Sequence, residues 1–371
     1  MKKRIYLSAP HLSGEELEYI KSAFQSNWIT SIGQNIDDFE REIAKRVSSP
    51  YSVALNSGTS ALHLACKVAG IGKGDVVLTS SLTFIASTNA ITYCGATPVL
   101  IDCDKDSWCI SVSALEKALK KYKPKAILTV NLYGQSCDYD EIISLCKKYN
   151  AILIEDGAES LGSTYKGKPC GSLGDISVIS FNGNKIITTS GGGMLLSNNR
   201  EYVDRARFLS TQARESRDFY EHNEIGYNYR LSNILAGIGL GQLKVLDERV
   251  AKKKHIFNYY KENLKEIEEI KFMPIADYGE SNYWLSVITL SGDKVTNFEL
   301  MRHLESENIE SRIAWKPMHL QPVYSSLDYV TTENDLSKKI FESGLCLPSD
   351  TNLTEEELFE ICKQIKSAFK G

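Results

Sequence analysis

Several hallmarks of other protein classes are missing from this sequence. Its nine cysteines include no Cys-x-x-Cys pair, and no histidine cluster joins the two that are closest together, Cys103 and Cys109. This spacing predicts neither a disulfide framework nor a metal site, and it indicates reduced thiols in the cytoplasm. No apolar run is long enough to span a bilayer. We therefore expect no metal and no membrane attachment.

An excess of positive charge is also missing. The formal net charge is −4, and no basic run of the kind that binds nucleic acid occurs. Residues 1–4 are basic, but the polar Ser8 and His11 follow too soon for the apolar segment of a secretory leader. These features exclude nucleic acid as an expected partner and support a cytoplasmic location.

What the sequence contains is typical of a large globular enzyme. Hydrophobic residues make up 42% of the 371 residues and charged residues 24%, so the chain can bury an extensive core. The length predicts two domains. We expect an N-terminal arm and a large domain over residues 1–250, and a smaller α/β domain over residues 251–371.

Short apolar segments alternate with helical patterns from Ser52 onward. The expected strands are residues 52–56, 76–79, 97–102, 126–131, 151–155, 176–181 and 193–196. The expected helices are residues 16–24, 36–47, 59–69, 86–93, 112–121 and 139–149. This alternation predicts an α/β fold with a mostly parallel, seven-stranded sheet covered on both faces. The later elements are expected to be a long helix over residues 231–267, a strand over 282–290, and helices over 297–307 and 354–369.

Loops at the carboxyl ends of the strands are the expected ligand site of such a sheet. The first, residues 56–61, reads Asn-Ser-Gly-Thr-Ser-Ala and opens a helix. The turn at Gly58, the free amides of Thr59 and Ser60 and the helix dipole would favour a phosphate. An ordinary helix cap is the alternative, and neither a Walker loop nor a dinucleotide-binding glycine pattern is present.

Charged residues follow two further strands. Asp156 ends the strand that leads into residues 154–160, where a buried carboxylate needs a cation or a donor; a salt-bridged or capping aspartate is the alternative. Lys185 lies in the polar, glycine-containing loop 180–193, with a solvated loop lysine as the alternative. Phe84 lies at a strand-to-helix junction, with core packing as the alternative.

One ligand accounts for these loops together. A phosphate-binding helix terminus, a carboxylate, an aromatic plate and a lysine are the groups that pyridoxal phosphate requires. The lysine amine adds to the cofactor aldehyde, and the carboxylate keeps the ring nitrogen protonated. The set in this order predicts pyridoxal 5′-phosphate as the cofactor and Lys185 as the catalytic residue.

The same stretches resemble those of a known family over essentially the whole chain. The matching motifs are residues 7–11, 56–64, 81–84, 155–159, 180–193 and 226–231. They are similar to the pyridoxal phosphate-dependent aminotransferases that act on nucleotide-linked 4-keto hexoses, within the aspartate-aminotransferase fold type. Related sugar dehydratases carry histidine at the position of Lys185, so the lysine favours transamination.

The resemblance implies a role for each matching residue around the cofactor. Lys185 corresponds to the lysine that forms a Schiff base, and Asp156 to the partner of the ring nitrogen. Glu159 would lie near the ring hydroxyl, where many relatives have glutamine, and Phe84 would stack on the ring. The residues expected to hold the phosphate are Gly58, Thr59, Ser60 and Ser180.

The resemblance also implies contacts beyond the ring. Asn228 would reach the phosphate bound by a neighbouring subunit, which implies a homodimer with shared active sites. Residues 312–321 lie near the substrate in the family, so Lys316 and His319 are expected to contact the sugar or its diphosphate; a solvent-facing loop is the alternative. Arg230 and Trp28 complete the predicted substrate-binding set, with core packing as the alternative for Trp28.

Residues 182–190, 210–215 and 220–222 resemble one branch of the family, which makes the 4-amino group of UDP-linked trideoxy sugars in the N-acetylbacillosamine pathway. This implies transfer from glutamate to UDP-2-acetamido-2,6-dideoxy-4-ketoglucose, for a bacterial surface glycan or protein glycosylation. A GDP-perosamine-type synthase is the alternative. A cofactor-binding paralogue without turnover and a related enzyme acting on free amino acids also remain open.

Overall fold

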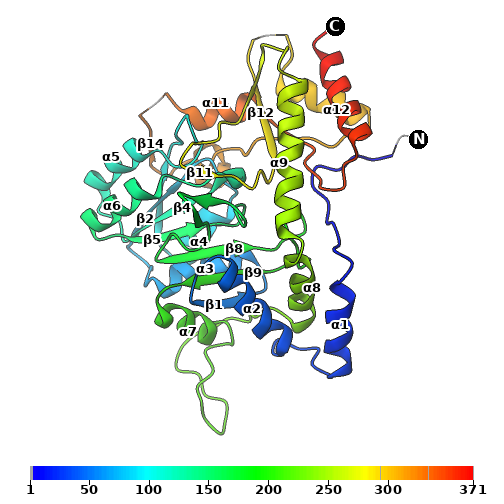
Figure 1. Ribbon diagram of the computed structural model, residues 1–371. Coiled ribbons are helices and arrows are strands. Elements are labelled where there is room, and N and C mark those ends of the chain that lie inside the picture. The colour runs from blue at the N-terminus through cyan, green and yellow to red at the C-terminus, as the bar shows by residue number, and fades with distance from the viewer. Residues whose placement is uncertain (1–2, 293, 333, 371) are drawn as a thin grey trace.

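A sheet of eight strands forms the centre of the molecule (Figure 1). The computed structural model describes residues 3–292, 294–332 and 334–370, so the first two residues of the basic opening lie outside it. The strand order is β1-β9-β8-β5-β4-β2-β3-β14. In that order the strands are Tyr51–Leu55, Gly193–Ser197, Ile176–Ser180, Ile152–Asp156, Ala126–Val130, Val76–Ser80, Thr97–Ile101 and Tyr329–Val330.

The sheet is mostly parallel, as the alternation of strands and helices predicts. Every neighbouring pair from β8 to β14 is parallel, and β9 runs antiparallel to both β1 and β8. The sheet has one strand more than the predicted seven, because Tyr329 and Val330 pair with Leu100 and Ile101. A strand of two residues has no periodicity of its own, so no pattern in the sequence indicates it.

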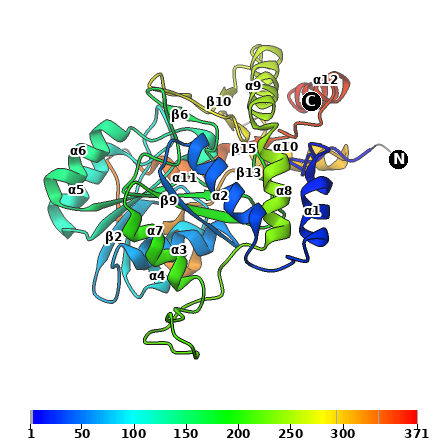
Figure 2. The same ribbon diagram turned by 60° about the horizontal axis from the view of Figure 1, so that its bottom comes forward.

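Helices cover both faces of this sheet (Figures 1 and 2). One face packs against α3 (Gly58–Val68), α4 (Ala86–Tyr93) and α7 (Arg200–Leu209). The other face packs against α2 (Gln34–Arg46), α5 (Val112–Tyr122) and α6 (Tyr139–Tyr149). Adjacent strand residues point to opposite faces, so Ile127 and Leu128 enter different cores. Both faces of the strands are therefore buried, which explains their continuous apolar sequences.

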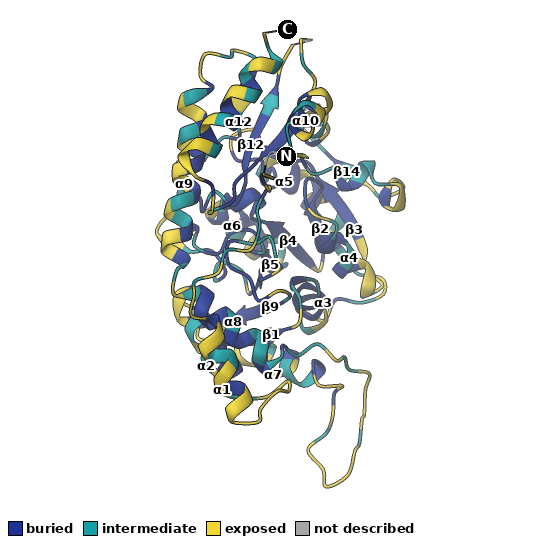
Figure 3. Cartoon of the chain, turned by 90° about the vertical axis from the view of Figure 1, so that its right-hand side faces the viewer, coloured by how far each residue is buried: buried dark blue, intermediate teal, exposed yellow. Residues whose placement is uncertain are grey.

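A second, antiparallel sheet lies toward the C-terminus, in the order β10-β12-β15-β13. Its strands are Ile270–Phe272, Ser286–Leu290, Gly344–Leu347 and Arg312–Ile313. Helices α9 (Leu246–Asn263), α10 (Asn297–Ser306) and α12 (Glu355–Ala368) share a core with it. Strand β12 of this sheet is mostly dark blue in Figure 3, the colour of buried residues. The expected domain boundary at residue 250 falls inside α9, and this division stays a prediction.

The prediction of one long helix over residues 231–267 is wrong. The structure has two helices there, α8 (Asn233–Leu243) and α9, separated at Lys244 and Val245. Helix α8 packs against α1 (Glu16–Gln25), so closely that a Cβ atom at Gly241 would lie 2.9 Å from the backbone nitrogen of Glu16. Helix α9 packs against the second sheet instead. One straight helix could not pack against both α1 and the second sheet, so the helix is interrupted between the two contacts.

The strand expected over residues 282–290 begins later, at Ser286. Before it, the buried Asn282 side chain donates to the carbonyls of Glu159 and Leu161, and Tyr283 has a φ of 53°. A left-handed residue interrupts an extended strand, so the segment turns here. The remaining elements are α11 (Leu336–Ser343), β6 (Thr164–Tyr165), β7 (Lys168–Pro169), β11 (Gly279–Glu280) and three short 3-10 helices over Leu132–Gly134, Met318–Leu320 and Pro322–Tyr324. Within the described ranges, no helix is both long enough and apolar enough to cross a bilayer.

Candidate active site

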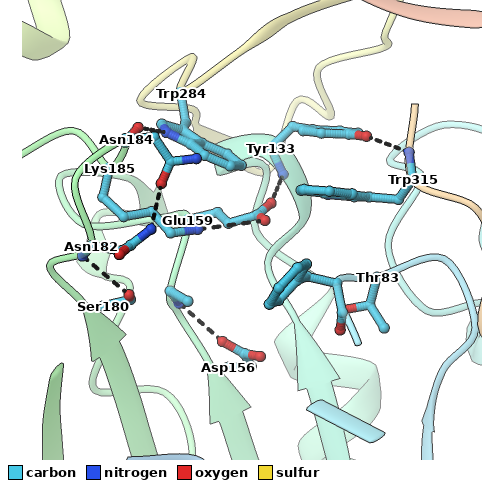
Figure 4. A network of polar contacts seen from close by, with 12 residues as sticks. Thr83, Tyr133, Asp156, Glu159, Ser180, Asn182, Asn184, Lys185, Trp284 and Trp315 are labelled. Carbon is cyan, nitrogen blue, oxygen red and sulfur yellow. Dashed lines mark hydrogen bonds and ion pairs between the residues drawn. The ribbon is translucent and has the colours of Figure 1, made fainter. Parts of the chain in front are cut away.

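The predicted loops converge on one cavity of about 470 Å³ at the carboxyl ends of the central strands (Figure 4). The predicted residues that line it are Gly58, Thr59, Phe84, Asp156, Glu159, Ser180 and Lys185. Of the predicted cofactor-binding set, Ser60 and Asn228 are not in the lining. The structure thus brings together residues that are up to 127 positions apart in the chain, from Gly58 to Lys185.

The N-terminus of α3 presents open amides to the cavity. Ser57 caps the helix, and its hydroxyl accepts the N–H of Ser60 at 3.0 Å. The Ser60 hydroxyl donates to Asn56 Oδ1 at 2.6 Å, so Ser60 serves the cap rather than the cavity. The N–H groups of Gly58 and Thr59 have no acceptor among the described residues. Two free donors at the positive end of a helix form an anion site.

Asp156 ends β5 at the floor of the cavity. Its Oδ2 accepts the hydroxyl proton of Ser87 at 2.7 Å, and its Oδ1 accepts the N–H of Ala158 at 3.0 Å. Burial raises the pKa of the Asp156 carboxyl, although both hydrogen bonds and the charge of Lys185 oppose the shift. A cationic partner in the cavity would therefore favour the charged carboxylate.

Lys185 points into the cavity toward Glu159 (Figure 4). Its Nζ lies 3.7 Å from Glu159 Oε1, and 13% of the lysine side chain is exposed, which excludes the solvated-loop alternative. Burial lowers the pKa of the Lys185 amine, opposed by the charges of Glu159 and Asp156. Burial also raises the pKa of Glu159, whose other oxygen accepts the N–H of Tyr133 at 2.7 Å. The pair is held close, in surroundings that favour the neutral form of each partner.

Three side chains, Trp284, Tyr133 and Trp315, form an aromatic wall above these charges. The Trp284 ring centroid lies 4.0 Å from Lys185 Nζ. The rings of Tyr133 and Trp315 are stacked, with centroids 6.2 Å apart. Phe84 lies beside Trp315 and is 50% exposed, so it lines the cavity and is not a core residue. Trp284 and Trp315 line one side of the cavity with apolar surface, and Tyr133 packs against both of them.

Two predicted residues after β9 lie outside the cavity of their own chain. Arg230 donates to Glu40 Oε1 at 3.0 Å and to the carbonyl of Ala54 at 2.9 Å, with 7% of its side chain exposed. Asn228 is exposed, and its carbonyl accepts the side-chain amide of Asn56 at 3.2 Å. Within this chain, the guanidinium of Arg230 binds a structural carboxylate.

The other predicted substrate-binding residues are also outside the lining. His319 lies between Ser81 Oγ, at 2.7 Å, and Asp335 Oδ2, at 3.3 Å, with its side chain 10% exposed. Burial lowers the pKa of the His319 ring. Lys316 is partly exposed, and its carbonyl accepts the side-chain amide of Gln321. Trp28 is 49% exposed, which excludes core packing. The substrate contacts of these residues stay predictions.

Several lining residues were not predicted from the sequence. Arg312 and Trp315 line the cavity and belong to residues 312–321, the segment in which the sequence predicts Lys316 and His319 as the contacts. Arg312 is the one cation besides Lys185 among the described lining residues. Ser87 lies three residues after the matching motif 81–84, and its contact with Asp156 follows only from the packed sheet. Trp284 lies in a turn that the sequence pattern assigns to a strand.

Comparison with known proteins gives a consistent result over nearly the whole chain. Residues 10–366 match the DegT/DnrJ/EryC1/StrS aminotransferase family. EpsN of Bacillus subtilis, named as a candidate pyridoxal phosphate-dependent aminotransferase, is 49% identical over 364 residues, covering 96% of this chain and 94% of that protein. GDP-perosamine synthase of Caulobacter vibrioides is 40% identical over 357 residues, covering 96% of this chain and 95% of that enzyme.

A solved structure gives the same similarity in three dimensions. A candidate sugar aminotransferase of Streptococcus pneumoniae, in its PLP form, matches with a TM-score of 0.91 at 28% sequence identity. The match covers 99% of this chain and 99% of that chain. Both the large sheet and the C-terminal sheet are therefore included in the likeness.

Proposed function

The chain belongs to the DegT/DnrJ/EryC1/StrS aminotransferase family, and on that premise we propose that it aminates C4 of a nucleotide-linked 4-keto-6-deoxy sugar, with glutamate as donor. It is an aminotransferase that uses pyridoxal phosphate and acts on a nucleotide sugar. One observation carries the proposal: the amine of Lys185 is held 3.7 Å from Glu159, in a cavity that also presents Asp156 and the open amides of α3.

The residues around the cavity fit pyridoxal phosphate. The amides of Gly58 and Thr59 and the hydroxyl of Ser180 would hold its phosphate. A side chain at Gly58 would fill that space, because its Cβ would lie 2.9 Å from Ser180 Cβ. Asp156 would hold the ring nitrogen, and Lys185 the aldehyde carbon. When bound, the cofactor carries the amino group between the substrates and withdraws electrons from the carbon that loses a proton.

Lys185 is placed to move protons in both half-reactions. The lowered pKa of its amine increases the neutral fraction at neutral pH, which is the form that accepts a proton. In the first half-reaction the amine takes the proton from the donor's α-carbon, and in the second an ammonium delivers one to C4 of the sugar. Glu159 stabilises Lys185 while it is charged. The aromatic wall limits the access of water to these transfers.

For the acceptor we propose UDP-2-acetamido-2,6-dideoxy-4-ketoglucose, whose 4-amino product would serve a surface glycan or protein glycosylation. The support is the stretch 182–190, which resembles the branch that aminates such UDP sugars. Two residues of this stretch, Asn182 and Asn184, line the cavity beside Lys185. The Asn182 side chain donates to Asn184 Oδ1 at 3.1 Å, so the stretch shapes the rim where a sugar would enter.

A GDP-linked 4-keto-6-deoxy sugar is the second candidate acceptor. The similarity to a GDP-perosamine synthase over almost the full chain supports it. Both candidates require the same chemistry at C4, so the cofactor-binding residues do not separate them. The nucleotide must be distinguished by assay.

We further propose a homodimer in a reducing compartment such as the cytoplasm. The side chain of Asn228 is exposed and lies outside its own cavity, as expected of a residue that completes the site of a second subunit. Lys316 and His319 are proposed as substrate contacts from the family resemblance, Arg230 as a member of the matching motif 226–231, and Trp28 as an exposed aromatic residue. All nine cysteines are free thiols, which suits a reducing environment.

The visible absorption of the cofactor-loaded enzyme tests the function through two additions. Glutamate should remove the band of the lysine-bound cofactor, and the UDP 4-keto sugar should then restore it. Lys185→Ala is the matched control, and it should show neither change. Recovery with the GDP keto sugar alone would replace the first acceptor by the second. A band that does not respond to glutamate, or no band after cofactor is added, would refute the transaminase assignment.

A further inference from the structure

A second buried lysine, Lys253 on α9, is not part of the mechanism described above. Only 2% of the residue is exposed. Its Nζ donates to the carbonyl of Ser349 at 2.7 Å, to the carbonyl of Trp284 at 2.9 Å and to Ser8 Oγ at 3.5 Å. Three partners from three separate segments meet at this one ammonium group.

These partners lead directly to the loop that carries Lys185. The Trp284 indole N–H donates to the carbonyl of Asn184 at 2.8 Å, and the Ser8 hydroxyl donates to the same carbonyl at 3.2 Å. The Trp284 ring also covers the Lys185 amine. Lys253 therefore fixes both groups that hold the residue immediately before Lys185.

We propose that Lys253 is a positioning residue: the hydrogen bonds of its amine hold Trp284 and the arm residue Ser8 against the Lys185 loop, and so keep the Lys185 amine buried and reactive. The proposal rests on the proposed function of Lys185. Lys253 is not among the described residues that line the cavity, so it acts through Trp284 and Asn184 rather than on substrate.

The surroundings of Lys253 indicate why a hydrogen-bond donor is needed there. Asp350 is the charged group that opposes the burial of this ammonium, and its Oδ2 accepts the N–H of Ala9 in the arm. Burial lowers the pKa of Lys253 to about 7. A buried ammonium is unfavourable unless it is well bonded, and an apolar side chain here would leave the carbonyls of Trp284 and Ser349 without this donor.

Loss of the hydrogen bonds from Lys253 should raise the pKa of the Lys185 amine. Burial is the largest cause of the lowered pKa of the Lys185 amine. When Trp284 is released, water reaches the amine and its pKa rises toward the ordinary lysine value. Each unit of that rise decreases the neutral, reactive fraction near neutral pH about tenfold.

The test measures the reactivity of Lys185 in the full-length, cofactor-free protein. Trinitrobenzenesulfonate modifies neutral amines, and peptide mass spectrometry reports modification at Lys185 over a pH series from about 6 to about 10. In Lys253→Met we expect the curve, scaled to its own alkaline plateau, to move to alkaline pH, so that the scaled rate near neutral pH is about tenfold lower than in wild type. Lys253→Arg should restore the wild-type curve, and Lys254→Met, at an exposed lysine of the same helix, should not change it.

Two further measurements keep the outcome decisive. Trp284→Phe removes the donor to Asn184 and part of the ring that covers the Lys185 amine, so it should move the curve in the same direction even if Lys253→Met does not fold. If Lys253 acts through Trp284, the double variant should shift the curve by less than the sum of the two single shifts. A fully additive shift would contradict this. A wild-type curve in folded Lys253→Met, or in Trp284→Phe, would overturn the proposal. Binding of pyridoxal phosphate to wild type, followed separately, shows whether the proposed function itself has failed.

Discussion

Two consecutive carboxylates, Glu155 and Asp156, end β5 and differ in the number of hydrogen bonds that they accept. Glu155 is fully buried and accepts four hydrogen bonds, from the N–H groups of Gly171 and Leu173, the hydroxyl of Ser177 and the amide of Asn131. Asp156 accepts two and faces the cavity. Because a carboxylate has about four acceptor sites, Glu155 is saturated and Asp156 is not. Burial alone does not mark a functional carboxylate, whereas unfilled bonding capacity at a cavity does.

The two buried lysines differ in the same way. The ammonium of Lys253 has a partner for each of its three protons. Lys185 has one ion-pair partner, Glu159, and otherwise faces the cavity and an aromatic ring. The saturated groups hold the structure, and the unsaturated groups are available for a ligand. The following variants test this contrast.

Lys185→Ala should have the largest effect. Removing the amine that accepts and returns the proton should decrease the rate of both half-reactions by at least about 10³-fold. Single-turnover absorbance with glutamate, and then with the keto sugar, measures each half-reaction. The ion pair with the buried Glu159 is also lost, so the thermal midpoint of the cofactor-free variant is measured alongside to separate a loss of stability from a loss of catalysis. Wild-type turnover would remove Lys185 from the mechanism.

Asp156→Asn should come next, with a decrease in turnover of about 100-fold or more. The substitution keeps the size of the side chain and removes the charge that would stabilise a protonated ring nitrogen. Stopped-flow measurement of proton removal from glutamate reports the chemical step, and titration with cofactor reports binding. If turnover stays unchanged while cofactor affinity falls, Asp156 is a binding residue without an electronic role.

Glu155→Gln should affect the fold and not the chemistry. One oxygen is replaced by an amide that cannot accept from Leu173 and Ser177, which should lower the free energy of unfolding by about 1–3 kcal/mol. Urea unfolding measures that loss, and turnover per folded molecule should match wild type. A fall in turnover without a fall in stability would contradict the contrast between the neighbouring carboxylates.

Ser87→Ala should have the smallest effect, and one that depends on pH. The hydroxyl stabilises the charged Asp156, so its removal raises the pKa of that carboxyl further. A raised pKa in the folded state adds stability below the ordinary carboxyl pKa, and this contribution is lost as pH rises through the raised value. Turnover should fall a few-fold at acidic pH and little at alkaline pH. An equal loss at every pH would mean that Ser87 acts through packing.

The sequence predicts the parts of the site that lie on regular strand-loop-helix units. The open amides of Gly58 and Thr59, the carboxylate of Asp156 and the loop of Lys185 each follow an apolar strand, and the parallel order of the sheet brings them together. The aromatic wall could not be predicted in this way, because Trp284 and Trp315 come from turns whose position depends on the packing of the second sheet.

Other features depend on tertiary contacts that leave no local pattern. The break between α8 and α9 follows from two packing partners, and a pattern of apolar residues continues across it. In the sequence Lys253 resembles any lysine of a polar helix. Its distinguishing feature is that its amine hydrogen-bonds to Ser8, Trp284 and Ser349, which are distant in the sequence. Arg230 belongs to a matching motif, yet its own chain supplies Glu40 as its partner.

Strand β14, at the edge of the large sheet, is synthesised long after its neighbour β3. Tyr329 and Val330 cover the open edge of β3, and Asp102, just beyond that edge, accepts hydrogen bonds from Thr331, Leu336 and Ser337. During synthesis, β3 leaves the ribosome long before this covering segment exists. A bare parallel edge can pair with another chain in that interval. The nascent N-terminal part should therefore be the species that chaperones bind and that aggregates when the gene is cut short.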